Sequence, residues 1–160
     1  MQIRAYQPST DLPALGALYR QTVLAIGPQH YSPQQVSVWA SYGDDLDAIA
    51  PRLSQGITLV GTVDDQPIAF GQLAPADYLA FLYCHSDHCR RGYASAIYDV
   101  LESHARQAGS AQITTHASVF SRPVFARKGF EVVEIEQANV KDVHFERYIM
   151  RKTLIPARAE

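Results

Sequence analysis

The chain has 160 residues, with 14 basic and 16 acidic side chains, a net charge of -2 and 47% hydrophobic residues. This length suits one domain with a real core, over residues 1–160, and the near-neutral charge argues against a nucleic-acid partner. No run approaches the roughly 18 apolar residues of a membrane span, and the N-terminus lacks the apolar stretch of a signal peptide, so we expect a cytoplasmic protein.

The first half of the chain predicts a strand followed by helices. Residues 1–6 alternate weakly, as an edge strand does. Ser9, Thr10 and Asp11 are candidate N-caps for a helix that Gly27-Pro28 ends. Ser32-Pro33-Gln34-Gln35 is a capping box that starts a second helix, and a third short helix is expected from Asp45 to Leu53.

The second half predicts a sheet with two further helices. Apolar runs at 57–63 and 68–73 flank the polar turn at 64–67 and indicate an antiparallel hairpin. A strand at 78–84 then leads into an amphipathic helix that Gly109 ends. The remaining pattern predicts a strand at 112–117, a short helix capped by Ser118 or Ser121 and ending at Lys128-Gly129, strands at 130–135 and 143–154, and a frayed tail at 156–160.

The turn between the 78–84 strand and its helix is the most informative stretch of the chain. It reads His85-Ser86-Asp87-His88-Cys89-Arg90-Arg91-Gly92-Tyr93-Ala94. A helix N-terminus presents free N–H groups and the positive end of the helix dipole, so it can hold a phosphate if the backbone comes close. Gly92 and the small Ala94 allow that approach. We interpret this turn as an anion site.

The same turn contains two cysteines and two histidines within six residues, Cys84-His85-Ser86-Asp87-His88-Cys89. Zinc sites usually join two ligand pairs from separate turns, and four candidates along one strand end do not readily point at one centre. We therefore predict no metal, although a small metal-binding protein stays open as an alternative function. A disulfide is not expected in a reducing cytosol.

The run Leu82 to Ala94 resembles the acetyl-coenzyme A motif of the GNAT (Gcn5-related) N-acetyltransferases, Q/R-x-x-G-x-G/A. Cys89 stands at its first position and Arg91-Gly92-Tyr93-Ala94 match its end. Val124-Phe125-Ala126-Arg127-Lys128-Gly129-Phe130 is similar to the family's later motif, Leu-Tyr-x-x-x-Gly-Phe. The resemblance implies an α+β three-layer fold whose mixed, mostly antiparallel sheet has helices on both faces and a splayed central strand pair.

The resemblance also implies that acetyl-CoA is the acyl donor. The N–H of Leu82 would bind the thioester carbonyl, and the strand would pair with the pantetheine arm up to Cys84. Ser118 falls where relatives often carry an Asn that touches that arm. The cofactor-binding residues that follow are Leu82, Tyr83, Cys84, Cys89, Arg90, Arg91, Gly92, Tyr93, Ala94, Ser95, Ser118, Phe125 and Lys128.

Acyl transfer to an amine also needs a base and a proton source for the thiolate. The family's frequent acid, a tyrosine, is Phe125 here, and a phenyl ring donates no proton. Water, or a phenol such as Tyr78, Tyr83 or Tyr148, would have to serve instead. For the base, His116 is the best candidate because its ordinary pKa lies near neutrality, and Asp77 and Tyr78 are the others. A structural role for His116, and a turn role for Asp77, remain open.

In this family the first two helices form part of the acceptor pocket, so His30, Tyr31 and Trp39 are the candidate substrate-binding residues. An aromatic patch there would suit an apolar or aromatic acceptor, although core packing is an equal alternative for Tyr31 and Trp39. The sequence thus predicts an N-acetyltransferase that uses acetyl-CoA and a small-molecule or peptide amine. A non-catalytic acyl-CoA-binding or regulatory module is the alternative, and a homodimer is one option for assembly.

Overall fold

The computed structural model describes residues 1–154, so the tail expected to fray, residues 156–160, lies outside the described residues. One seven-stranded sheet runs in the order β1-β2-β3-β4-β5-β7-β6, and every neighbouring pair is antiparallel except β4 and β5. The strands are β1 (Gln2–Ala5), β2 (Ile57–Val63), β3 (Gln66–Leu73), β4 (Tyr78–Cys84), β5 (Gln112–Ala117), β6 (Glu131–Val140) and β7 (Val143–Thr153).

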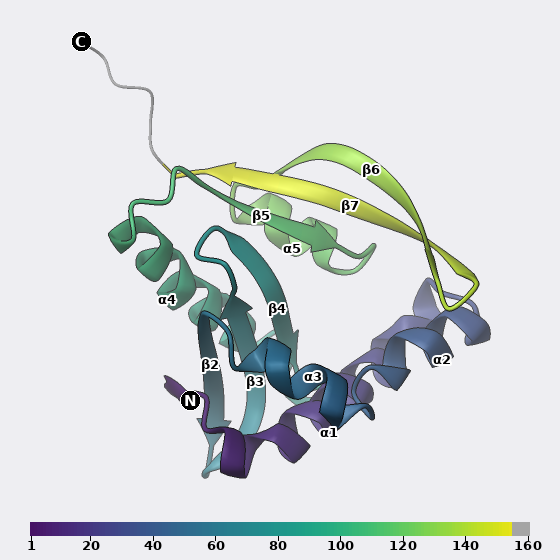
Figure 1. The fold of residues 1–160 in the computed structure, drawn as a ribbon, viewed down its shortest axis with the longest axis horizontal. Helices are drawn as coiled ribbons and strands as arrows, with labels where there is room; N and C mark the ends of the chain where they lie inside the picture. The colour runs from purple at the N-terminus through teal and green to yellow at the C-terminus, as the bar shows by residue number, and fades with distance from the viewer. Residues whose placement is uncertain (155–160) are drawn as a thin grey trace.

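Helices cover both faces of this sheet (Figure 1). The α-helices are α1 (Pro8–Ile26), α2 (Pro33–Ser41), α3 (Leu46–Leu53), α4 (Tyr93–Gln107) and α5 (Ser121–Arg127), and the short 3-10 turns are η1 (Gly27–Gln29) and η2 (Ser86–His88). Each face has its own apolar core. Leu15 of α1 and Ile49 of α3 belong to one core, and Leu101 of α4 and Phe125 of α5 belong to the other. The predicted three-layer α+β fold is confirmed.

Local signals explain most of these elements. The capping box predicted for α2 is present, since Ser32 accepts the N–H of Gln35 at 3.1 Å while the Gln35 side chain accepts the N–H of Ser32 at 2.9 Å. Asp64 and Asp65 take positive φ values of 49° and 63°, which close the β2–β3 hairpin in the twist that two-residue turns favour. The predicted hairpin is therefore confirmed.

Several predicted boundaries were wrong. β3 begins at Gln66 rather than at residue 68, and the N-cap of α5 is Phe120 rather than Ser118 or Ser121. The first helix starts at Pro8 with Gln7 as its N-cap, not at Ser9, Thr10 or Asp11. The Asp11 carboxylate instead accepts the Gln7 N–H at 2.8 Å and a two-pronged hydrogen bond from Arg4, so a partner on β1 decided the helix start. β6 runs to Val140 rather than to residue 135, because polar residues are tolerated on an exposed edge strand.

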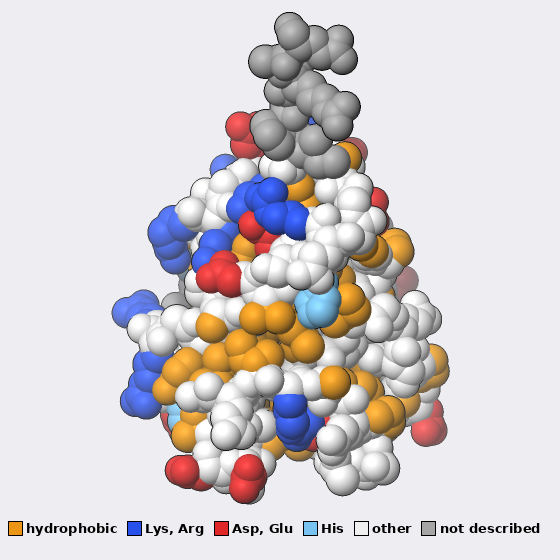
Figure 2. Space-filling model, turned by 90° about the vertical axis from the view of Figure 1, so that its left-hand side faces the viewer, with side chains coloured by type: hydrophobic (Ala, Val, Ile, Leu, Met, Phe, Trp, Pro, Cys, Tyr) orange, Lys and Arg blue, Asp and Glu red, His pale blue; other side chains and the backbone are white. Residues whose placement is uncertain are grey.

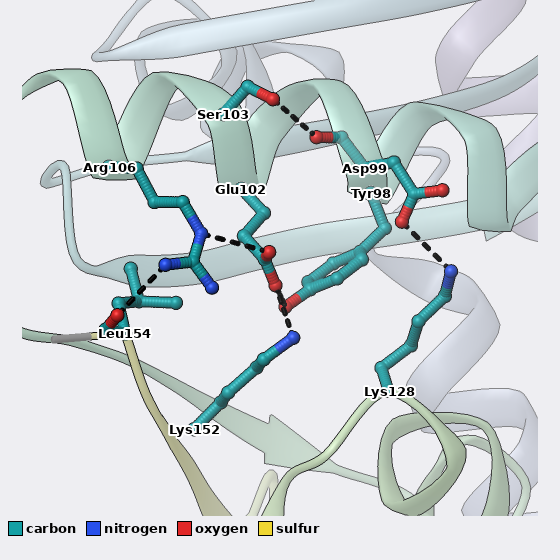
Figure 3. Close-up of polar contacts among 8 residues, drawn as sticks. All are labelled: Tyr98, Asp99, Glu102, Ser103, Arg106, Lys128, Lys152 and Leu154. Carbon is teal, nitrogen blue, oxygen red and sulfur yellow. Dashed lines mark hydrogen bonds and ion pairs between the residues drawn. The ribbon is translucent and has the colours of Figure 1, made fainter. Parts of the chain in front are cut away.

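α4 is held against β7 by a cluster of polar side chains around Glu102 (Figure 3). The Glu102 carboxylate accepts hydrogen bonds from the Tyr98 hydroxyl at 2.8 Å, from Arg106 Nε at 3.1 Å and from Lys152 of β7. Arg106 also donates to the Leu154 carbonyl at 2.8 Å. Burial raises the pKa of the Glu102 carboxyl, but these donors outweigh it and hold that pKa below its usual value. The cluster fixes the helix whose N-terminus carries the predicted anion site.

Apolar side chains reach the surface of the described part of the chain. Figure 2 shows a band of them across the middle of the face at the left of Figure 1, with basic side chains along one margin. Among the described residues, the exposed large apolar side chains include three on the edge strand β6, namely Val132, Val133 and Ile135. None of the helices in residues 1–154 is both long enough and apolar enough to cross a membrane.

Candidate active site between two splayed strands

β4 separates from β5 shortly after the two strands begin. Their parallel pairing covers Tyr78 with Thr114 and Leu79 with Thr115. On its other side β4 stays paired with β3, but Phe81 faces Gln72 while Leu79 faces Leu73, so Ala80 is the extra residue of a β-bulge. The bulge bends β4 away from β5, as Figure 1 shows. The sheet is therefore open beside β4, as the predicted splay required.

The backbone of Leu82 faces this opening. His85 N–H donates to the Ile68 carbonyl of β3 at 2.8 Å, and alternate residues of a strand direct their backbone groups to opposite edges. Leu82 and Cys84 therefore direct theirs away from β3. The Cys84 carbonyl accordingly accepts a hydrogen bond at 3.0 Å from Thr22 of α1. The N–H of Leu82 is thus available to a molecule that lies along the free edge of β4.

The turn that follows β4 ends in an uncapped helix N-terminus. The first turn of α4 is closed by the bond from Ala96 N–H to the Gly92 carbonyl, at 2.9 Å. Within residues 1–154, the N–H groups of residues 90–95 have no acceptor. Gly92 has a φ of +79°, and a Cβ built there would meet no atom within 4 Å. Open space therefore lies beside free donors, which fits the oxygen atoms of a pyrophosphate.

The positive charge at this turn has no carboxylate partner within residues 1–154. Arg90 and Arg91 are exposed, and neither has a carboxylate within ion-pair distance in the described part of the chain. Lys128, also predicted to reach the phosphates, instead lies 2.8 Å from the Asp99 carboxylate of α4 (Figure 3). The turn itself is tied to α1, since Gln21 both donates to the Ser86 hydroxyl and accepts its N–H at 3.3 Å.

A cavity of about 520 Å³ extends from the splay. Its lining includes six of the predicted cofactor residues, which are Leu82, Tyr83, Cys84, Cys89, Ser118 and Phe125. The remaining residues of the turn, from Arg90 to Ser95, form the adjacent helix start.

Burial raises the pKa of the Cys84 thiol to about 11, so this thiol is protonated at neutral pH. Among the described residues, no group of three or more His, Cys, Asp or Glu side chains could hold a metal ion.

The candidate bases lie in different surroundings. His116 is exposed, lines the cavity and meets the Tyr78 ring edge-on, with ring centroids 5.5 Å apart. Burial raises the pKa of the Tyr78 phenol, which keeps it protonated at neutral pH. Asp77 is exposed in the turn before β4 and lies outside the cavity lining, and its carbonyl accepts the Thr114 N–H at 2.8 Å. His116 and Tyr78 are thus the pair that the structure brings to the site.

The predicted acceptor residues only partly meet there. Tyr31 and Trp39 line the cavity with their rings edge-on, 5.4 Å apart, and the Tyr31 hydroxyl accepts the Val119 N–H at 3.2 Å. His30 is exposed and outside the lining, but it packs on Phe120, which lies within it. Burial raises the pKa of the Tyr31 phenol. The aromatic patch expected on this side of the cavity is present.

The lining residues that the sequence analysis missed include Arg52, Phe120, Phe145 and Arg147. Phe145 and Arg147 are two residues apart in β7 and therefore lie on the same face of the strand. The Arg147 Nε atom donates to Glu136 of β6 at 2.9 Å. A charged residue in a strand that lies between two others is a usable signal for a site, because such positions are seldom occupied by charge without a partner. Arg52, near the end of a short helix, gave no such signal.

The splay, the bulge beside it and the free helix N-terminus together define an acyltransferase of the GNAT type. A family model described as the acetyltransferase (GNAT) domain matches residues 28–154. The chain therefore belongs to the GNAT family and is an N-acetyltransferase. The predicted membership of the GNAT family is confirmed.

Relatives and solved structures agree with this assignment. The uncharacterized N-acetyltransferase YafP of Escherichia coli K12 is 31% identical over 151 residues, which cover 94% of this chain and 95% of that protein. A GCN5-related N-acetyltransferase of Rhodopseudomonas palustris superposes with a TM-score of 0.92 at 28% identity, covering 96% of this chain and 95% of that one. A putative acetyltransferase of Salmonella typhimurium, solved with acetyl-CoA, shares the fold at a TM-score of 0.73 and 16% identity, over 100% and 97% of the two chains.

Proposed function

We propose that this N-acetyltransferase takes its acetyl group from acetyl-CoA and transfers it directly to an amine bound in the cavity. The observation that carries the proposal is the free edge of β4 next to the uncapped N-terminus of α4. An extended pantetheine arm can add to such an edge as a strand does, and a pyrophosphate suits the free N–H groups of residues 90–95. Solved relatives of the same fold are described as complexes with coenzyme A and with acetyl-CoA.

In this proposal the donor supplies an activated thioester, and the protein positions and polarises it. The Leu82 N–H donates to the thioester oxygen and stabilises the negative charge that develops there. Cys84, Ser118 and Phe125 line the path of the pantetheine arm, and Arg90 and Arg91 attract the phosphates. None of these contacts needs an unusual side chain, which agrees with Cys89 standing where the motif has Gln or Arg.

The acceptor approaches from the face covered by α1 and α2. Tyr31 and Trp39 bind its apolar part, and His30 lies just outside. His116 takes the proton that the amine loses as the new C–N bond forms, since its ring lines the cavity beside Tyr78. The leaving sulfur gains its proton from water or from a phenol. The Tyr78 ring packs against His116, whereas the Tyr148 hydroxyl is engaged with Glu146 at 3.0 Å.

The test measures donor binding first and turnover second. At a free acetyl-CoA concentration of about 100 times its Kd, the free energy of unfolding should rise by about 2.7 kcal/mol. Release of free thiol with a panel of amines then reports transfer. No thermal shift with saturating acetyl-CoA would contradict the donor assignment. Binding without thiol release from any amine would favour a non-catalytic acyl-CoA-binding module. A cytoplasmic location, a single domain over residues 1–160 and a homodimer stay predictions.

A further inference from the structure

Arg52 is an exposed cation that lines the cavity and has no ion-pair partner within residues 1–154. It is the last residue but one of α3, and its guanidinium carbon lies 4.7 Å from the centre of the Phe81 ring. Within residues 1–154 this guanidinium makes no hydrogen bond and no ion pair. A guanidinium stacked on an aromatic ring keeps its N–H donors free in the ring plane, where a carboxylate can bind them in pairs.

No carboxylate in residues 1–154 lies within ion-pair distance of Arg52. Arg147 is already hydrogen-bonded to Glu136 of β6, so that pair is close to neutral. Glu146, which also lines the cavity, accepts a hydrogen bond from the neutral Tyr148 hydroxyl and keeps its negative charge, but it lies beyond ion-pair distance of Arg52. The pKa of the Tyr78 phenol is raised chiefly by burial, while Arg52 and Arg147 oppose that rise and Glu136 adds to it. Both arginines and Glu136 therefore act on the same phenol, and one positive charge remains there without a partner.

The local positive charge of Arg52 beside Tyr78 is unfavourable for a simple ammonium substrate. An acceptor that carries only an amine would enter the cavity as a cation and be repelled by Arg52, whereas an amine with its own carboxylate would not. Position supports the same conclusion, because Phe81, beneath Arg52, directly precedes Leu82 in β4. A carboxylate on Arg52 would thus lie near the strand residue whose N–H is proposed to hold the thioester oxygen.

We propose that the acetyl acceptor is an amino acid or a similar amino carboxylate with an apolar side chain, and that Arg52 binds its carboxylate. The inference rests on the proposed function, since it assigns the acceptor of the same reaction. The apolar side chain packs on the aromatic wall that Trp39 and Phe145 help to form. The amine is directed toward His116 and the splay.

The test compares matched ligands in calorimetric titrations of the protein saturated with coenzyme A, so that binding is measured without turnover. The probes are phenylalanine and leucine, each paired with its carboxamide. In the parent protein at least one carboxylate should bind about tenfold more tightly than its carboxamide, as a charge-assisted pair implies. Arg52→Gln should reduce this ratio to about twofold or less. Comparing the carboxylate-to-carboxamide affinity ratio between parent and variant cancels any difference between the amines of the two ligands.

Arg20→Gln is the matched control. Arg20 pairs with Asp44 at 2.7 Å on the surface and lies outside the cavity lining, so its loss removes one positive charge without touching the site. The carboxylate preference should persist in this variant. The inference would be overturned if Arg52→Gln kept the same carboxylate preference as the parent, or if the parent showed no carboxylate preference.

A parallel assay of thiol release separates this inference from the proposed function. Acetylation of amines without any dependence on a carboxylate would overturn the Arg52 assignment and leave the acetyltransferase proposal standing. Carboxylate binding that depends on Arg52, with no thiol release from any amine, would support the carboxylate subsite and contradict the proposed transfer reaction.

Discussion

The two sides of β4 are built in different ways. On the donor side, the groups proposed to hold acetyl-CoA are backbone N–H groups from one stretch of chain, Leu82 to Ser95, and a glycine gives access to them. On the acceptor side, the wall consists of side chains from separate elements, among them Trp39 of α2, Arg52 of α3, His116 of β5 and Phe145 of β7. The first arrangement suits one invariant ligand, and the second allows the acceptor to change by substitution of side chains.

The sharpest test of the donor side is Gly92→Val. A valine would be strained at a φ of +79° and would place its side chain in the open space before the free N–H groups. We expect acetyl-CoA affinity to fall by about 100-fold or more, because several backbone N–H groups would lose their hydrogen bonds to the pyrophosphate at once. Isothermal titration and chemical unfolding measure affinity and stability separately.

Gly109→Val is the matched control for this variant. Gly109 follows the other end of α4, has the same φ of +79° and likewise has no atom within 4 Å of the place that a Cβ would take. The strain of a valine at position 109 should lower the free energy of unfolding by a similar amount, about 1–3 kcal/mol, with no loss of acetyl-CoA affinity. Equal affinities in the two folded variants would show that the turn at Gly92 does not bind the donor.

The acceptor side is tested by His116→Ala. If this imidazole is the base, turnover should fall by about 100-fold and the pH dependence near neutrality should disappear. A pH–rate profile at saturating acetyl-CoA measures both, and His144→Ala, an exposed histidine outside the cavity lining, is the control. Turnover and a profile like those of the parent would make His116 structural and leave Tyr78 and Asp77 as the next candidates.

A smaller effect is expected from Glu102→Gln, which weakens the support of α4 without changing its N-terminus. The carboxylate is 18% exposed and has three donors, so its loss should lower the free energy of unfolding by about 1–3 kcal/mol. Acetyl-CoA affinity should change by less than about twofold, since binding on this side depends on backbone groups. Glu134→Gln, on the exposed edge strand β6, is the control.

Glu102 should also make the stability of the protein depend on pH. Because the folded-state pKa of Glu102 lies below its ordinary value of 4.5, the stabilisation is complete above that value and is lost as the pH falls through the folded-state pKa. The difference in unfolding free energy between parent and Glu102→Gln should therefore shrink as the pH is lowered from about 6 to about 3. A constant difference over this range would contradict the ionised network.

The sequence predicted best the elements whose signals are local. The capping box at Ser32, the hairpin turn at Asp64-Asp65 and the glycine at the start of α4 each act within a few residues. The start of α1 was wrong because Asp11 is engaged by Arg4, a partner on another element that no local pattern contains. Long-range pairs of this kind decide boundaries that propensity alone leaves open.

The acceptor side was predicted less completely for the same reason. Tyr31 and Trp39 were identified because the family uses its first helices there, whereas Arg52 and Arg147 meet only when α3 and β7 are brought to the same cavity. Neither residue has an unusual neighbour in the sequence. Within residues 1–154 Arg52 has no ion-pair partner, because the fold pairs Glu136 with Arg147 and places Arg52 on the Phe81 ring. A sequence pattern does not contain this information.

The smallest effect is expected from Phe125→Tyr, which adds a phenol where the family often has one. Phe125 is 4% exposed, lines the cavity and packs against Phe130 with ring centroids 5.2 Å apart. Because a coenzyme A thiol is acidic enough to leave without a dedicated acid, turnover should stay unchanged or rise by no more than about threefold. The measurement is the turnover number across pH, with acetyl-CoA affinity determined independently.

Phe130→Tyr tells a chemical effect of the new hydroxyl from a packing effect. Phe130 is equally buried but does not line the cavity, so its hydroxyl would be buried without access to the leaving sulfur and should only lower stability. A rise in turnover confined to Phe125→Tyr would place position 125 next to the sulfur. Loss of acetyl-CoA affinity in Phe125→Tyr would instead mean that this ring is packed too tightly to have replaced a donor, and the comparison of the 124–130 segment with the family motif would need a different register.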